Sequence, residues 1–308
     1  MKKSEAYRRI SECGILPTVF VYDLSDTVTL ARTLYENGIR VIELLQRTPH
    51  ALEAIARVKE SVPGMTVGAG TVLDPDSARR VYEHGADYVV SPYYHQEIVD
   101  WCNEHDIAVI PGCATITEVS RGYDSGLRVF KYFPTNQLGG MDVIRQISEI
   151  YADARYVATG GITMEQLYEY SASKYICAVG SVCMMPQALI RAHDWEGIAA
   201  LTRKSVAGSL GLSQIYSAGR GSAFNEELQL FESGRSGSGP VCDDFFTLGE
   251  RPERGLCTNS IERTLAHFTD RGMRGEILRR DTDGTPILAD LVDEKSGART
   301  RLIARTIL

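Results

Sequence analysis

Short apolar runs rich in β-branched residues alternate with amphipathic stretches between residues 15 and 207. A short apolar run bounded by polar residues predicts a buried strand, and apolar positions that recur every three or four residues predict a helix. The predicted strands are Ile15–Tyr22, Arg40–Gln46, Thr66–Val72, Tyr88–Pro92, Ala108–Ala114, Val129–Pro134, Tyr156–Gly161 and Tyr175–Gly180. The predicted helices between them are Asp26–Asn37, Pro49–Ser61, Asp74–His84, His95–His105, Thr117–Ser125, Met141–Ile150 and Thr163–Ser171.

Residues at the helix ends support this assignment. Asp74, which precedes Pro75, and Thr163 are typical capping residues, because their side chains accept a hydrogen bond from a free backbone N–H. Gly38 and Gly85 follow predicted helices, where glycine adopts the left-handed conformation that ends a helix.

The order of these elements predicts an α/β fold with a parallel sheet, because strands recur about every 20 to 25 residues with a helix after each. A closed barrel and a doubly wound open sheet both fit this order. Eight strands satisfy the barrel, so we favour a (β/α)8 TIM barrel over residues 1–207. Function in such a barrel gathers at the carboxyl ends of the strands, and candidate residues are sought there.

The sequence changes character after the barrel. Residues 208–254 hold many Gly and Ser residues and are predicted to be a linker and an irregular segment. Residues 255–308 predict a small α+β domain of β-α-β-β-β type, which we interpret as an accessory domain. Its predicted elements are a strand at Gly255–Thr258, a helix at Ser260–Arg271, and strands at Gly275–Arg280, Pro286–Val292 and Thr300–Arg305.

Composition and charge narrow the function classes. The chain of 308 residues is 44% hydrophobic and 24% charged, which is ordinary for a globular protein. Its formal net charge of -7 does not favour a nucleic acid or an anionic membrane as a partner. No apolar run approaches the roughly 18 residues of a membrane span, and the first residues lack the apolar core of a signal peptide.

The cysteines and histidines argue against disulfides and metals. The seven cysteines are odd in number, scattered, and form no C-x-x-C pair, so we expect reduced thiols in a cytoplasmic protein. No group of histidines and carboxylates has convincing metal-ligand spacing, and we expect neither a metal nor another cofactor.

Lys131 is the first candidate for chemistry, because it lies inside a predicted strand between Phe130 and Tyr132. Strand alternation places its side chain on one face with Val129 and Phe133, in an apolar setting. Desolvation disfavours the ammonium form and favours a neutral amine that can form a Schiff base with a carbonyl substrate. The alternative is a lysine that extends past the strand end to solvent.

Glu43 is a second charge within an apolar strand, and it shares a face with Arg47. A buried carboxylate needs a partner, and Lys131 is the obvious one if the second and sixth strands lie opposite each other in the barrel. Glu43 would then be a general acid and base next to the amine. A purely structural buried ion pair remains the alternative.

Glycines and hydroxyls at the ends of two consecutive strands suggest phosphate binding. Thr159, Gly160 and Gly161 end the seventh predicted strand, and Gly180 and Ser181 end the eighth. The loops after these strands often bind phosphate in barrels, and glycines let backbone N–H groups approach the oxygens. Simple turn formation is the alternative for either motif alone.

A substrate carboxylate could be bound at the ends of the second and third strands. Thr71 follows the Gly68–Gly70 segment, and Arg47 lies close to the end of the neighbouring strand. The segment lacks the third glycine of a dinucleotide fingerprint, so it does not indicate a dinucleotide site. A tight turn at Thr71 is an equally good explanation.

The joint order of these motifs resembles the family of 2-keto-3-deoxy-6-phosphogluconate (KDPG) aldolases, which includes 4-hydroxy-2-oxoglutarate (KHG) aldolases. The resemblance covers about residues 10 to 206. It rests on the segments 40–48 (RVIELLQRT), 67–73 (VGAGTVL), 90–92 (VSP), 110–112 (IPG), 130–134 (FKYFP), 159–162 (TGGI) and 180–181 (GS).

The resemblance implies a class I aldolase barrel, usually a homotrimer, that uses no cofactor and acts on small keto acids in carbohydrate metabolism of the Entner–Doudoroff type. It implies Lys131 as the Schiff-base lysine and Glu43 as the proton-transfer carboxylate. The remaining implied roles are the pyruvyl end for Arg47, Thr71 and Pro92, the pocket wall for Phe133, and phosphate binding for Gly160, Gly161 and Ser181. The tail around Cys257–Leu265 resembles a shortened glyoxalase-type appendage found on some members.

Three functional hypotheses follow. The leading one is retro-aldol cleavage of KDPG, or of a close 2-keto-3-deoxy sugar acid, to pyruvate and glyceraldehyde 3-phosphate, which makes the protein a lyase. The second is cleavage of the unphosphorylated KHG to pyruvate and glyoxylate. The third is a catalytically weak regulatory protein that binds a keto acid, and it is motivated by departures from the family pattern at Leu45, Tyr93 and Val179.

Overall fold

The computed structural model describes residues 1–217, 252 and 254–305. Two compact units divide the chain, Met1–Thr202 and Arg203–Leu308. The division falls inside helix α10, Trp195–Leu210, near the end of the predicted barrel domain at residue 207.

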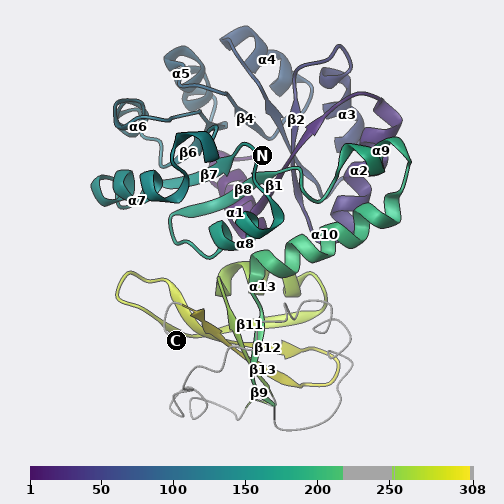
Figure 1. Ribbon diagram of the computed structural model, residues 1–308, viewed down its shortest axis with the longest axis vertical. Coiled ribbons are helices and arrows are strands. Elements are labelled where there is room, and N and C mark those ends of the chain that lie inside the picture. Colours follow the sequence, from purple (N-terminus) through teal and green to yellow (C-terminus); the bar gives the residue numbers. More distant parts are fainter. Residues whose placement is uncertain (218–251, 253, 306–308) are drawn as a thin grey trace. The chain divides into compact units, whose positions relative to one another are not determined.

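Eight parallel strands form the sheet of the first unit in the order β5-β4-β3-β2-β1-β8-β7-β6 (Figure 1). A parallel bridge between Gly112 and Lys131 joins β5 to β6 and closes the barrel, which confirms the TIM-barrel prediction and excludes the open sheet. The strands are β1 Ile15–Phe20, β2 Val41–Leu45, β3 Thr66–Gly70, β4 Tyr88–Val90, β5 Ala108–Ile110, β6 Val129–Tyr132, β7 Arg155–Thr159 and β8 Ile176–Ser181.

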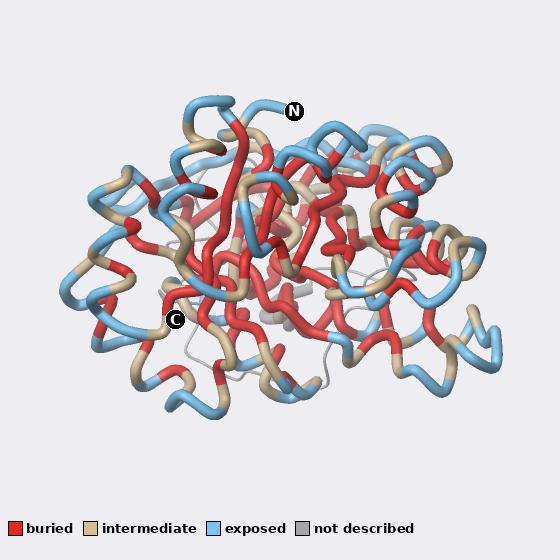
Figure 2. The backbone as a smooth tube through the Cα atoms, turned by 90° about the horizontal axis from the view of Figure 1, so that it is seen from above, coloured by how far each residue is buried: buried red, intermediate tan, exposed pale blue. Residues whose placement is uncertain are grey.

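Helices connect the strands and lie outside them, so the strands are buried while the outer faces of the helices are exposed (Figures 1 and 2). Asp74 caps its helix by accepting a hydrogen bond from the Ser77 N–H, and Thr163 accepts one from Gln166, as predicted. The helices are α2 Leu24–Glu36, α3 Ala51–Ser61, α4 Pro75–Glu83, α5 Gln96–Glu104, α6 Ile116–Asp124, α7 Gly140–Ile150, α8 Met164–Ser171 and α9 Gln187–Arg191, with a short 3-10 helix η1 at Asn136–Leu138.

The inward-facing side chains of the barrel stack in layers, because neighbouring strands are staggered by one residue and alternate strands contribute to each layer. A path that starts at Lys131 and moves one residue towards the carboxyl end at each neighbouring strand returns to Lys131 after one circuit of the barrel, so each layer closes on itself. From the amino-terminal to the carboxyl end of the strands, the layers are Val41, Tyr88, Val129 and Ala178; Leu16, Gly68, Ile110 and Val157; Glu43, Val90, Lys131 and Gly180; and Thr18, Gly70, Gly112 and Thr159.

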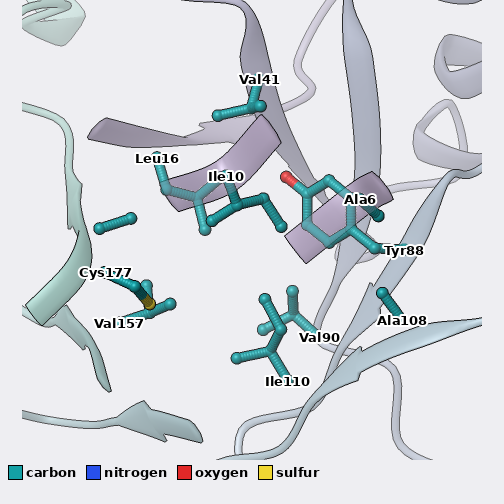
Figure 3. Packing of buried hydrophobic residues seen from close by; sticks show 11 residues of the cluster. Ala6, Ile10, Leu16, Val41, Tyr88, Val90, Ala108, Ile110, Val157 and Cys177 are labelled. Atoms are coloured by element: carbon teal, nitrogen blue, oxygen red, sulfur yellow. The ribbon is translucent and has the colours of Figure 1, made fainter. Parts of the chain in front are cut away.

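Helix α1, Lys3–Cys13, closes the amino-terminal end of the barrel and was not among the predicted elements. Ala6 and Ile10 are one helical turn apart, and they pack on the side chains of the two lowest layers (Figure 3). Tyr7 also donates a hydrogen bond to the Val109 carbonyl of β5 at 2.8 Å. In the described part of the chain, α1 therefore fills the side of the barrel opposite the carboxyl ends.

The second unit contains a sheet in the order β11-β12-β13-β10-β9 and one helix, α13. Its described elements match the predicted β-α-β-β-β order, and Arg301 and Asp290 form a fully buried ion pair on neighbouring strands. The elements are β9 Ser213–Ser217, β10 Arg254–Thr258, α13 Ile261–Thr269, β11 Met273–Arg280, β12 Pro286–Asp293 and β13 Arg299–Ala304.

The predicted linker at residues 208–254 contains regular structure at both ends. Helix α10 continues to Leu210, and β9 pairs antiparallel with β10 as an additional strand of the sheet. The pairing partner of β9 is more than 30 residues away in sequence, which local patterns do not reveal. Residues 218–251 and 253 lie outside the described residues. Among the helices that the structure describes, none combines the length and the apolar character needed to cross a bilayer.

Candidate active site

The two buried charges meet in the third layer of the barrel. Lys131 on β6 and Glu43 on β2 come from opposite sides, and the Lys131 Nζ lies 3.1 Å from the Glu43 Oε1. The lysine side chain is 7% exposed and the glutamate side chain is fully buried. Lys131 borders a cavity and Glu43 does not, so the amine lies between the carboxylate and the cavity.

The glycines of β3 make room for this pair. A Cβ at Gly70 would lie 2.1 Å from the Glu43 Oε1, and a Cβ at Gly68 would collide with the Tyr88 ring. The Tyr88 hydroxyl donates to the Ile42 carbonyl at 2.8 Å, and burial, reinforced by the nearby Glu43 carboxylate, raises the pKa of this phenol well above its usual value. These two glycines of β3 therefore act mainly as space inside the barrel.

One carboxylate oxygen of Glu43 is not engaged. Its Oε2 is buried and makes no hydrogen bond to any residue that the structure describes. An unpaired buried acceptor is costly, so this oxygen is expected to be occupied when substrate or water enters the site. Oε2 of Glu43 can therefore accept a proton next to the Lys131 amine.

Arg47 and Thr71 lie together at the mouth of the barrel, as the sequence predicted. The Arg47 Nε donates a hydrogen bond to the Thr71 Oγ1 at 2.9 Å, and Thr71 adopts a positive φ of 61°. The guanidinium group keeps other donors free for a carboxylate, which it binds with strong charge-assisted hydrogen bonds. Pro92 and Phe133 border the same cavity, and the Lys131 Nζ lies 5.4 Å from the centre of the Phe133 ring.

The loops after β7 and β8 present free backbone donors. Gly160 and Gly161 have positive φ values of 111° and 65°, which turn their N–H groups away from the sheet. Within the described part of the chain, the N–H groups of Gly160, Gly161 and Val182 make no hydrogen bond. Ser181 instead joins the two loops, because its hydroxyl donates to the Ile162 carbonyl at 2.9 Å. Backbone groups are therefore better placed than the Ser181 hydroxyl to bind an anion here.

These residues surround one cavity of about 170 Å³ at the carboxyl ends of the strands. Every candidate residue from the sequence except Glu43 borders it. Four further residues do so and were not predicted as site residues, namely Thr18, Leu45, Ile162 and Val182. Thr18 could have been found from the register of β1, since it faces inward directly beside Glu43.

A (β/α)8 barrel with a buried lysine at the base of such a cavity defines a class of lyases that bind carbonyl substrates covalently. The family model described as KDPG and KHG aldolase matches residues 7–201 of this chain. The chain therefore belongs to the KDPG and KHG aldolase family. The match ends at residue 201 and leaves the second unit without a counterpart in that model.

Individual relatives agree with the family match. The 2-dehydro-3-deoxy-phosphogluconate aldolase of Dickeya dadantii is 34% identical over 207 residues, which cover 67% of this chain and 97% of that protein. A KDPG aldolase from Legionella pneumophila, solved with pyruvate captured as a covalent carbinolamine, is 29% identical with a TM-score of 0.62 and covers 64% of this chain and 96% of that one. The KDPG aldolase of Zymomonas mobilis, solved with 3-phosphoglycerate, is 31% identical with a TM-score of 0.63 and covers 67% and 96% of the two chains.

Gly180 supports the shape of the cavity, because a Cβ at this position would lie 2.2 Å from the Thr159 Oγ1. We expect Gly180→Ala to displace the threonine and to lower the free energy of unfolding by about 1–3 kcal/mol. Denaturant unfolding followed by circular dichroism measures this change. Adding Thr159→Ala removes the colliding hydroxyl and should restore part of the loss, whereas additive losses in the double variant would contradict this explanation.

Proposed function

We propose that the barrel is a class I aldolase that cleaves KDPG, or a close 2-keto-3-deoxy-6-phospho sugar acid, to pyruvate and glyceraldehyde 3-phosphate. The observation that supports this most is the contact between the Lys131 amine and the Glu43 carboxylate at the base of the cavity. Family membership and the relatives named above point to the same reaction.

Lys131 would form the covalent bond to substrate. Its neutral amine attacks the C2 carbonyl of the keto acid, and the resulting carbinolamine loses water to give an imine. Glu43 lies next to the nitrogen, so its carboxyl group can give a proton to the departing hydroxide and take one from the nitrogen. The carbinolamine captured in the Legionella pneumophila aldolase is the corresponding first intermediate in a relative.

The protonated imine then accepts the electron pair of the bond between C3 and C4. The C4 hydroxyl gives up its proton as that carbon becomes the aldehyde, and the pyruvyl carbons remain on the lysine as an enamine. Protonation of the enamine at C3, followed by attack of water on the imine carbon, releases pyruvate and regenerates the amine. Glu43 can serve as the base and acid for these proton transfers, because it contacts the lysine nitrogen through Oε1. Its Oε2 has no other partner in the described structure and can accept the proton.

Arg47 and Thr71 would bind the C1 carboxylate, with Pro92 and Phe133 holding the pyruvyl end against the lysine. The phosphate at the other end of the substrate would be bound by the free N–H groups of Gly160 and Gly161 and the hydroxyl of Thr159, near Gly180 and Ser181. Backbone N–H groups bind phosphate well without a basic side chain, particularly where the chain also enters a helix, as it does at α8.

Cleavage of KHG is the second candidate, because the matched family includes both activities. The backbone N–H groups of Gly160 and Gly161 make no hydrogen bond within the described chain and are available for a phosphate, which favours the phosphorylated substrate. The regulatory alternative is less well supported, since a protein that only binds a keto acid gains little from burying Lys131 and Glu43 together.

Covalent trapping tests the proposed chemistry. With pyruvate and sodium borohydride, we expect a reduced pyruvyl adduct on Lys131, found by mass spectrometry of proteolytic peptides, because hydride converts the imine to a secondary amine that does not hydrolyse. Lys131→Met should abolish both the adduct and aldol cleavage. Lys174→Met, at an exposed lysine outside the cavity, is the matched control and should retain both. An adduct on another lysine would refute the assignment.

Substrate comparison tests the role of the phosphate. We expect kcat/KM for KDPG to exceed that for KHG by at least about 100-fold, since charge-assisted hydrogen bonds to phosphate contribute roughly 1.5–3 kcal/mol each. Pyruvate release coupled to lactate dehydrogenase measures both rates. Equal values, or a preference for KHG, would move the assignment to the second candidate.

We also propose a homo-oligomer, with a trimer as the expected form from the family resemblance. Large apolar side chains are exposed in segments that follow strands at the mouth of the barrel, at Phe20, Tyr22, Leu73, Tyr93, Ile116, Leu138 and Val182. Exposed apolar side chains at this end of the barrel would be covered if copies of the chain associate there. The described cysteines are free thiols, which supports a reducing compartment such as the cytoplasm.

Light scattering after size exclusion tests the oligomer. The wild type should have about three times the mass of one chain, and Ile116→Arg should shift the population towards monomer because it places a charge in the interface. Ile150→Arg introduces the same charge at an exposed position towards the amino-terminal end of β7 and is the matched control. A monomeric wild type would refute this proposal without affecting the assigned chemistry.

A further inference from the structure

The uppermost layer of the barrel contains only two side chains. Thr18 on β1 and Thr159 on β7 face inward, and the other two positions of this layer are Gly70 and Gly112. The space beside the two glycines is filled by neighbouring groups, because a Cβ at Gly70 would meet the Glu43 carboxylate and a Cβ at Gly112 would meet the Pro92 carbonyl. The two threonines, in contrast, border the cavity, so this layer contributes two hydroxyl groups to its wall.

The hydrogen-bonding state of the lining side chains distinguishes these two threonines. Arg47 is bonded to Thr71, Lys131 to Glu43, and Ser181 to the Ile162 carbonyl. Among the residues that the structure describes, the Thr159 hydroxyl is buried without a partner, and no hydrogen bond is formed by the half-buried Thr18 hydroxyl. Other threonines of the barrel, such as Thr48 and Thr135, do bond to neighbouring carbonyls.

The positions of the two hydroxyls along the wall differ. Thr159 lies on β7, next to the strand that carries Lys131, and the phosphate-binding loop follows it directly. Thr18 lies two strands further on, beside Glu43 and one residue after the register partner of Ser181. Gly180 on β8 separates them without a side chain of its own. Because the Thr159 hydroxyl is assigned to the phosphate, the Thr18 hydroxyl is the one left in this layer for a substrate group between Lys131 and the phosphate-binding loops.

We propose that Thr18 determines substrate specificity by hydrogen bonding the hydroxyl group of the aldehyde half, on the carbon next to the bond that is cleaved. The inference rests on the proposed aldolase function and deepens it. In KDPG this group is the C5 hydroxyl, which becomes the C2 hydroxyl of glyceraldehyde 3-phosphate. Leu45, the apolar lining residue above Glu43 on the adjacent strand, cannot make this bond.

A comparison of two aldehydes tests the inference in the condensation direction, with pyruvate as the partner and the full chain as the enzyme. D-Glyceraldehyde 3-phosphate carries the hydroxyl, and 3-oxopropyl phosphate lacks it but is otherwise the same length. Thr18→Val removes only the hydroxyl of the enzyme and keeps the side-chain volume. Thr18→Ser keeps the hydroxyl and is the matched control.

We expect Thr18→Val to lower kcat/KM for D-glyceraldehyde 3-phosphate about tenfold, the usual effect of one lost hydrogen bond. Its effect on 3-oxopropyl phosphate should stay within about twofold, and Thr18→Ser should retain most of the wild-type rate with both aldehydes. A general loss of packing would instead slow both aldehydes equally, because it does not depend on the substrate hydroxyl.

An equal effect of Thr18→Val on the two aldehydes, or none on either, would overturn the role of Thr18 while leaving the aldolase assignment intact. A wild-type enzyme that condenses neither aldehyde with pyruvate, and shows no borohydride adduct on Lys131, would overturn the proposed function itself. The two failures are therefore distinguishable in one set of measurements.

Discussion

The contact between Lys131 and Glu43 is the constraint on which the rest of the barrel interior depends. Two charged groups in a protein interior lose hydration, and their attraction compensates for this only when the geometry is close and the surroundings leave room for both. Gly70 provides that room beside the carboxylate, and its replacement by any larger residue would displace an oxygen of Glu43. The apolar layers below, closed by α1, keep water from reaching the pair from the opposite side.

The same stacking of layers explains why the cavity exists. Lower layers are filled by Tyr88 and by branched apolar side chains, as in an ordinary barrel core. In the two layers nearest the carboxyl ends, the residues that border the cavity beside Lys131 are Gly180, Thr18 and Thr159, whose side chains are absent or small, so the core is incomplete above the amine. Catalysis by an imine needs this arrangement, because the substrate carbonyl must come within bonding distance of a nitrogen that solvent does not hydrate.

The departures from the family pattern affect the cavity unequally. Leu45 borders it and presents an apolar surface. Tyr93 donates a hydrogen bond to the Leu73 carbonyl at 2.8 Å and does not border the cavity, and Val179 is a buried residue paired with Ile15 of β1. Only the first of these changes alters what a substrate meets. Tyr93 and Val179 therefore give no support to a regulatory protein without catalytic activity.

Local sequence patterns determined the eight strands and their order along the chain, because each strand is a short, mostly apolar run followed by an amphipathic helix. They favoured the closed barrel over the open sheet, and the bridge between β5 and β6 decided between the two. They also indicated Lys131 and Glu43, since a charge inside such a run is unusual wherever the strand is placed. That β2 and β6 lie opposite each other was inferred from the order of the strands alone. Helix α1 was not predicted, because only two of its residues, Ala6 and Ile10, are buried. Two apolar positions are too few to establish a helical repeat.

Tertiary structure alone decided how residues distant in sequence combine. The space that Gly70 leaves for Glu43, the free hydroxyl of Thr18, and the pairing of β9 with β10 all depend on contacts between strands. A threonine in a strand looks the same in sequence whether its hydroxyl bonds to a carbonyl or borders a cavity. Which of the two occurs is set by the stagger of the closed barrel, a property of the whole sheet that no single segment contains.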